Sequence, residues 1–150
     1  MMKTLTSIAN VAEYLLTKAP MSPKKLQKLC YYAYAWHLAV RAERLFSERF
    51  EAWVHGPVEP GLYQAYRHFG WHEIPKVQNT PSLHRAAIDT IDRVYAGYGH
   101  LSGDQLALLS HLEAPWQQAR SGIDNSEPST NQLDDDVIKA HFQAKWAGVE

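Results

Sequence analysis

The stretch that decides the fold is SPKKLQKLCYYAYAWHLAVRAER, residues 22–44. Ser22 followed by Pro23 is a helix-start signal, because serine caps a helix N-terminus and proline is tolerated at its first position. Apolar side chains then recur at helical spacing on one broad face, with little polar surface between them. The members of this face are Leu26, Leu29, Cys30, Ala33, Trp36, His37 and Val40. The pattern predicts a central, mostly enclosed helix over about 22–44.

Helical patterns also dominate on both sides of this segment. An amphipathic helix is expected near 8–16, and the pair Ala19-Pro20 ends it. Further helices are expected over about 59–69 with Gly70 as C-cap, over 83–98, after Ser102, at Pro115-Trp116 and from about 134 onward, with a polar loop over 121–132. The predicted fold class is therefore mainly α, a compact bundle of about six helices around the central one.

Residues 50–54 differ from their surroundings, because apolar and polar side chains alternate there as in a short strand. The strand opens EAWVHGPVEPG, residues 51–61, in which Gly56 permits a turn, Pro57 fixes φ and Pro60 suits the first turn of a helix. We interpret this segment as framework that ends the strand and turns the chain into the next helix. A second brief strand over 74–77 is left open.

Composition limits what the chain can be. Its 150 residues are 45% hydrophobic, which suits one domain over 1–150 with a real core. A formal net charge of −1 gives no overall attraction to nucleic acid or to an anionic membrane. Since we find one cysteine, no secretory signal and no long apolar run, we expect a cytoplasmic protein without a membrane segment.

The candidate chemical sites are weak. His68 and His72 have the spacing of two metal ligands on a helix, but Gly70 between them is expected to end that helix. Cys30 and His37 share a face but lie about 10 Å apart along the axis, too far for a direct hydrogen bond. No nucleophile elbow, phosphate loop or dinucleotide fingerprint occurs. We therefore assign no catalytic residue, metal or cofactor.

One surface stands out on the second helix. Lys24, Lys25, Lys28, Tyr31 and Tyr32 lie opposite the apolar face on a helical wheel. Lysines in the first turns of a helix oppose its macrodipole, and tyrosines beside flexible cations suit protein binding. These five residues are our candidate partner-binding surface. The alternative is a solvated face whose tyrosines lie partly under neighbouring helices.

Three segments together resemble a known family. They are MSPKKLQKLCYYAYAWHL (21–38), LFSERFEAWVHGPVEPGLYQAYRHFG (45–70) and GDQLALLSHLEAPWQQAR (103–120). The combination of KLQKL, EAW followed by GPV, and PW resembles the Panacea/SocA-like antitoxin domain, which also occurs in phage-associated proteins. The residues that carry the match include Trp53, Gly56, Pro57, Pro60 and Trp116, and Cys30 stands where the family often has a larger aliphatic residue.

The resemblance implies an antitoxin of a two-gene module, which neutralises a protein toxin encoded by the neighbouring gene by binding it directly. Some relatives carry an extra DNA-binding domain, and we expect no such separate domain within these 150 residues. The alternative, also implied by the resemblance, is a proteolytic adaptor that delivers the toxin to a protease.

A third hypothesis comes from the residues: an enzyme that acts on a small molecule, with His37, His55 or His111 as acid or base. It predicts an enclosed polar pocket that holds a histidine of strongly perturbed pKa.

Overall fold

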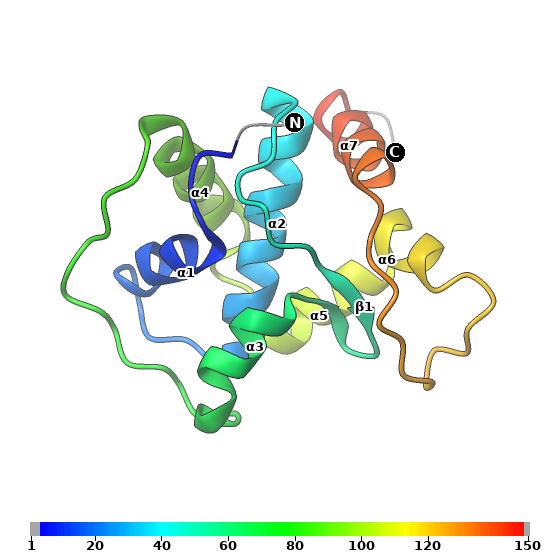
Figure 1. The fold of residues 1–150 in the computed structure, drawn as a ribbon, viewed down its shortest axis with the longest axis horizontal. Helices are drawn as coiled ribbons and strands as arrows, with labels where there is room; N and C mark the ends of the chain where they lie inside the picture. Colours follow the sequence, from blue (N-terminus) through cyan, green and yellow to red (C-terminus); the bar gives the residue numbers. More distant parts are fainter. Residues whose placement is uncertain (1–3, 149–150) are drawn as a thin grey trace.

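The computed structural model describes residues 4–148 and shows helices packed around one central helix, α2 (Figure 1). The elements are α1 Ile8–Leu16, α2 Pro23–Arg41, β1 Glu51–Trp53, β2 Gly56–Val58, α3 Pro60–Tyr66, the 3-10 helix η1 Arg67–Phe69, α4 Arg85–Tyr98, α5 Gly103–His111, α6 Ala114–Ala119 and α7 Asp135–Trp146. In Figure 1, α1 and α4 lie on one side of α2 and α6 and α7 on the other. The predicted mainly α class is confirmed. No helix within residues 4–148 has both the length and the apolar content that crossing a bilayer requires.

Helix α2 begins where the sequence predicts and ends slightly earlier. Ser22 caps it by accepting a hydrogen bond from the backbone N–H of Lys25 at 3.2 Å, with Pro23 in the first position. It ends at Arg41 rather than near Arg44, because Ala42 takes the left-handed conformation at φ 56°. Since α2 packs against α1, α3, α4, α5, α7 and β2, it is covered on nearly every side.

Aromatic rings from α2 fill the centre of the molecule. Tyr31 meets Tyr32, Phe50 and Phe142 edge to face, with ring centroids 5.2, 5.4 and 6.4 Å away. Edge-to-face pairs of this kind add to the stability that burial alone provides. The buried hydroxyl of Tyr32 donates a hydrogen bond to Glu113 Oε1 at 2.9 Å, so its polar group is satisfied inside the core.

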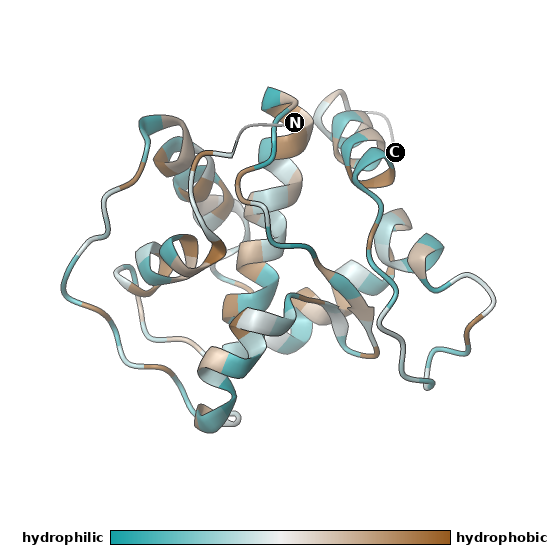
Figure 2. Cartoon of the chain, viewed as in Figure 1, coloured by the Kyte–Doolittle hydropathy of each residue, from teal (hydrophilic) through white to brown (hydrophobic). Residues whose placement is uncertain are grey.

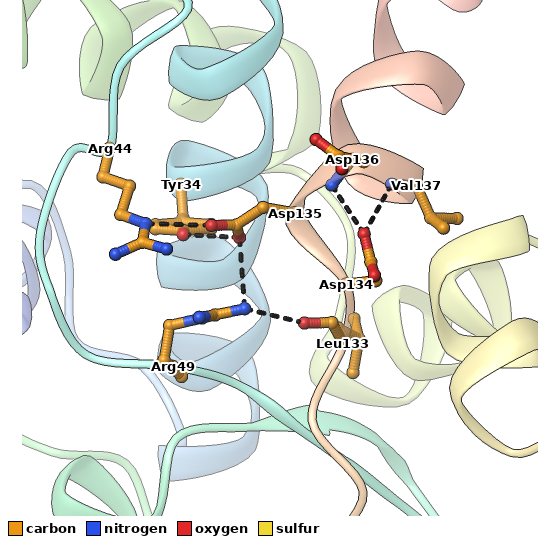
Figure 3. A network of polar contacts seen from close by, with 8 residues as sticks. All are labelled: Tyr34, Arg44, Arg49, Leu133, Asp134, Asp135, Asp136 and Val137. Carbon is orange, nitrogen blue, oxygen red and sulfur yellow. Dashed lines mark hydrogen bonds and ion pairs between the residues drawn. The ribbon is translucent and has the colours of Figure 1, made fainter. Parts of the chain in front are cut away.

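The carboxylate of Asp135 is one of the contacts that attach helix α7 to α2 and to the segment after it (Figure 3). Asp135 accepts hydrogen bonds from the Tyr34 hydroxyl at 2.7 Å and from Arg44 Nε at 2.9 Å, and Arg49 lies 3.6 Å away. Asp134 caps the helix by accepting from two backbone N–H groups of its first turn. The predicted acidic start of this helix thus both caps it and docks it. Near the end of this helix the side chain of Trp146 is 63% exposed.

The extended segment is a hairpin rather than a single strand. β1 pairs antiparallel with β2, and Trp53 faces Gly56 across a turn of two residues. The expectation that Gly56-Pro57 ends the strand is therefore wrong, since the chain turns and pairs with itself. Gly56 has φ +107°, and a Cβ there would lie 2.7 Å from Ser110 Oγ, so both conformation and space favour glycine.

Two further segments pair with their surroundings at single points. Residues 74–77 do not form a strand, because Ile74 makes only an isolated antiparallel bridge with Met21. On the open edge of β1, Leu133 N donates to Phe50 O at 2.9 Å and Ala52 N donates to Asn131 O at 2.8 Å. The polar loop before this contact, 121–130, is drawn mostly in hydrophilic colours in Figure 2.

Side chains of α2 hold the backbone of the hairpin. Gln27 Nε2 donates to Glu59 O at 3.0 Å, and Gln27 Oε1 accepts from Glu59 N at 3.0 Å, both in the interior. Lys28 Nζ donates to Pro57 O at 3.1 Å. Glu59 in turn caps α3 through the backbone N–H groups of its first turn. The KLQKL and GPVEP motifs are thus two halves of one contact.

The opposite side of the hairpin is held from α6. Trp116 Nε1 donates to Trp53 O at 2.8 Å, and Arg120 Nη1 donates to Ala52 O at 2.7 Å. Buried carbonyl oxygens need such partners, because an unsatisfied one costs about 1–3 kcal/mol. The PW motif therefore serves the same hairpin as the KLQKL motif.

We expect Gln27→Met to lower the free energy of unfolding by about 2–4 kcal/mol, because it leaves the buried N–H and C=O of Glu59 without partners. Urea denaturation measures the change. The matched control is Gln118→Met at an exposed position of α6, which should change stability by less than about 0.5 kcal/mol. Equal effects of the two substitutions would contradict an anchoring role for Gln27.

Candidate functional site

A pocket of about 260 Å³ lies between α2, the hairpin and α3, and we call it the α2–α3 pocket. Its apolar walls include Leu26, Val58 and Leu62, and its aromatic walls include Trp53, Tyr63 and Tyr66. Lys24, Lys28, Arg67 and His55 also line it, and none of its described lining residues is acidic. Sites for small molecules typically span about 300–1,000 Å³, so this one is sized for one or two side chains.

Helix α3 supplies the aromatic side of the pocket. Tyr63 and Tyr66 are three residues apart and therefore share a helix face. The Trp53 ring from β1 meets the Tyr63 ring edge to face at 5.0 Å, and its Nε1 donates to Glu51 Oε1 at 2.8 Å. Tyr63 is still 39% exposed, so the aromatic wall continues onto the surface.

The chain leaves the pocket through an exposed tryptophan. Gly70, which lines the pocket, closes η1 at φ +58° as the predicted C-cap. Trp71 follows directly and is 89% exposed. Large exposed aromatic side chains are a signature of binding surfaces, where tryptophan is enriched among the residues that carry most of the binding energy.

The structure divides the predicted basic and aromatic face of α2. Lys24 and Lys28 line the α2–α3 pocket, whereas Lys25 Nζ donates to Gly99 O at 2.6 Å, away from it. Tyr31 and Tyr32 lie in the core, where burial, followed by the nearby Glu113, raises the pKa of both hydroxyls. The expectation of a surface face is wrong at Lys28, Tyr31 and Tyr32, because neighbouring elements enclose α2 there too. Whether any of the five binds a partner stays a proposal.

Lys28 is the unexpected member of the pocket. Its side chain is 1% exposed, and among the described residues its amine has one hydrogen bond, to Pro57 O. Burial, and next the positive charge of Lys24, lower the pKa of Lys28 to about 7. A lysine on a helix with charged neighbours is normally predicted to be exposed to solvent. The sequence therefore does not indicate that Lys28 is buried.

The three histidines named as acid or base candidates do not share one site, although His55 acts electrostatically on His111. His55 is exposed in the hairpin turn and lines the pocket, and His111 stacks on Trp116 with centroids 4.1 Å apart. His37 is fully buried. Burial lowers the pKa of His37 and of His111. The structure does not bring these three residues into one site.

His37 belongs to a hydrogen-bonded row with Thr90 and Glu43. Its Nδ1 lies 2.7 Å from Thr90 Oγ1 and its Nε2 lies 3.0 Å from Glu43 Oε1. The order of groups is that of a hydroxyl, a base and an orienting carboxylate. However, Thr90 lies inside α4, where helical bonds occupy the backbone N–H groups that would stabilise an oxyanion. We interpret the row as a polar link between α2 and α4.

A second pocket of about 590 Å³ lies between α2, α4 and α7. Its lining includes Trp36, Val40, Arg93, Tyr98 and the exposed Trp146.

Within residues 4–148 no three histidine, cysteine, aspartate or glutamate side chains come together as a metal site. Cys30 is buried, and burial raises the pKa of its thiol.

Comparison with known proteins shows that the sequence is similar to those of antitoxins. Residues 26–117 match the family described as antitoxin SocA-like, Panacea domain. The chain is also 31% identical to antitoxin SocA of Caulobacter vibrioides (strain NA1000 / CB15N), over 93% of this chain and 84% of that protein. No solved structure matches the chain.

The pKa of Lys28 makes stability depend on pH. Its value is about 7 in the folded chain against 10.5 as the ordinary value, so between these limits the unfolded chain holds more protons and the free energy of unfolding rises with pH. We expect Lys28→Met to be more stable than wild type by about 2–4 kcal/mol at pH 6.5, because the charge penalty it removes exceeds the cost of about 1–3 kcal/mol for leaving Pro57 O unpaired. The advantage should shrink as the pH rises and should reverse near pH 10, where the unpaired carbonyl dominates. Urea denaturation at several pH values tests this.

The contribution of Lys28 to the pH profile can be distinguished from those of the titratable groups near it. Lys24 stays on the same helix in both proteins, and burial lowers the pKa of His111 from its ordinary value of 6.5. Lys139→Met on α7 is the matched control, because it makes the same substitution at a partly exposed position outside the pocket. Parallel pH profiles for wild type and Lys28→Met would show that the buried amine keeps an ordinary pKa.

Proposed function

The chain belongs to the SocA-like Panacea antitoxin family, and from this we propose that it is the antitoxin of a two-gene module and neutralises a protein toxin by binding it directly. The observation that carries the proposal is its 31% identity to an antitoxin over 93% of the chain. In this proposal the toxin is encoded by the neighbouring gene, the antitoxin acts as a non-enzymatic inhibitor, and both proteins are cytoplasmic.

The surface around the α2–α3 pocket supports a protein partner. Tyr63 and Trp71 present large rings to solvent beside a concave, mostly apolar site, and Lys24 and Arg67 lie at its edge. Interfaces between proteins are enriched in tyrosine, tryptophan and arginine, with such anchors placed near a pocket. We therefore place the toxin on this side of the molecule, with Lys24 and Lys28 retained from the predicted surface.

Co-expression with the neighbouring gene tests the function. We expect the neighbour to stop growth alone, to be tolerated together with this protein, and to co-purify with it as one complex. Rescue with loss of the toxin and no lasting complex would favour delivery to a protease instead, and depleting the protease would then restore toxicity. A harmless neighbour would contradict the antitoxin role for this pair of genes.

Substitution of two exposed tryptophans tests where on the surface the toxin binds. We expect Trp71→Ala to weaken toxin binding at least tenfold, since a tryptophan anchor typically contributes more than about 1.4 kcal/mol. Trp146→Ala, a matched change of a 63% exposed ring on α7, should leave affinity within about twofold. Calorimetry with the purified partner measures both. The reverse ranking would place the toxin on the second pocket, between α2, α4 and α7.

A further inference from the structure

The amine of Lys28 is buried without a counter-charge among the described residues. Within residues 4–148 its one hydrogen bond goes to Pro57 O, and no ion pair involves it. An ammonium group has three N–H donors, so two of them are left for another acceptor. A buried charge is strongly unfavourable unless it is paired, which makes this amine receptive to a carboxylate.

The groups around Lys28 are also positive. Lys24 is the charged neighbour that acts on it, and Arg67 lies exposed on the same pocket with no ion pair among the described residues. Lys24 is paired at 2.8 Å with Asp104, whose side chain is 85% exposed and lies outside the pocket lining. The described lining of the pocket therefore carries basic side chains and no acidic one, although the whole chain carries a net charge of −1.

The remaining walls of the α2–α3 pocket are mostly apolar and suit an apolar group of a ligand. Leu26 and Leu62 are buried, and Trp53 and Tyr63 form an edge-to-face pair at 5.0 Å beside them. A cavity of about 260 Å³ with these walls takes an aromatic or aliphatic side chain. A ligand that fills it and satisfies Lys28 must combine such a side chain with a nearby carboxylate.

We propose that the α2–α3 pocket binds an acidic segment of the toxin, in which an apolar side chain enters the pocket and an adjacent aspartate or glutamate pairs with Lys28. The inference rests on the proposed function for the identity of the partner. Charge complementarity sets its specificity, because a partner that lacks the acid leaves the Lys28 ammonium buried and unpaired. Lys28 thereby selects the partner at some expense of the stability of the free chain.

A pair of isosteric peptides tests the chemistry on the full chain. We expect N-acetyl-Trp-Asp-amide to bind about tenfold more tightly than N-acetyl-Trp-Asn-amide, and to shift the NMR signals of Trp53 and Tyr63. Lys28→Met should bind both peptides alike. Since that variant is expected to be more stable at neutral pH, lost preference would not reflect unfolding. Lys139→Gln, which removes a charge on α7, should keep the preference.

Three results of the peptide experiment would overturn the proposal. They are equal affinity for the two peptides, a preference that survives in Lys28→Met, and displacement of the aspartate peptide by inorganic phosphate at similar concentration. The last result would mark a general anion site rather than one for an acidic protein segment.

The toxin itself separates the two proposals. In the co-purified complex we expect Lys28→Met to bind at least tenfold more weakly than wild type and with less dependence on salt, while Lys139→Gln binds like wild type. A complex that forms normally with Lys28→Met refutes the inference and leaves the antitoxin function standing. A wild-type chain that neither binds nor neutralises the neighbouring product refutes the proposed function, and the identity of the partner with it.

Discussion

The structure depends on how the backbone of a hairpin with two three-residue strands is satisfied. Two strands this short are not stable by themselves, and all of β2 and the middle residue of β1 are buried. Gln27 and Lys28 supply partners from one side, and Trp116 and Arg120 from the other. The hairpin in turn gives α2, α3 and α6 a common polar anchor, in addition to the aromatic core, and so defines how they are placed.

This arrangement explains why the recurring motifs are far apart in sequence. KLQKL, EAW, GPVEP and PW look unrelated when they are read one at a time. In space they are donors and acceptors of one network, because Gln27 pairs with Glu59 and Trp116 with Trp53. The α2–α3 pocket is built from the same segments, so the residues that hold the framework also shape the surface that we assign to the partner.

Local signals made most of the helices predictable. Ser22-Pro23, Ser102 and Asp134 cap helices as expected, and Gly70 ends one, because capping depends on residues only a few positions apart. Long-range polar pairing was not predictable: neither β2 nor the contact of Leu133 with Phe50 follows from local pattern. The wheel placed Lys28, Tyr31 and Tyr32 on the surface because it assumes one buried face, whereas α2 is enclosed. The sequence patterns include the candidate-site residues Lys24, Lys28, Trp53 and Tyr63, but in different motifs. Nothing in those motifs indicates that the four residues line one pocket.

The polar partners of the central helix also bear on how the chain is made. The hydroxyls of Tyr32 and Tyr34 donate hydrogen bonds to Glu113 and Asp135, and Arg120 donates to a carbonyl oxygen of the hairpin. All three partners lie in the last third of the sequence. During synthesis the N-terminal residues leave the ribosome first, so the tyrosines of α2 remain exposed until these partners have been synthesised. A chain that stops early lacks them and exposes apolar surface to proteases. Only a chain that reaches α7 can therefore satisfy the buried hydroxyls of α2.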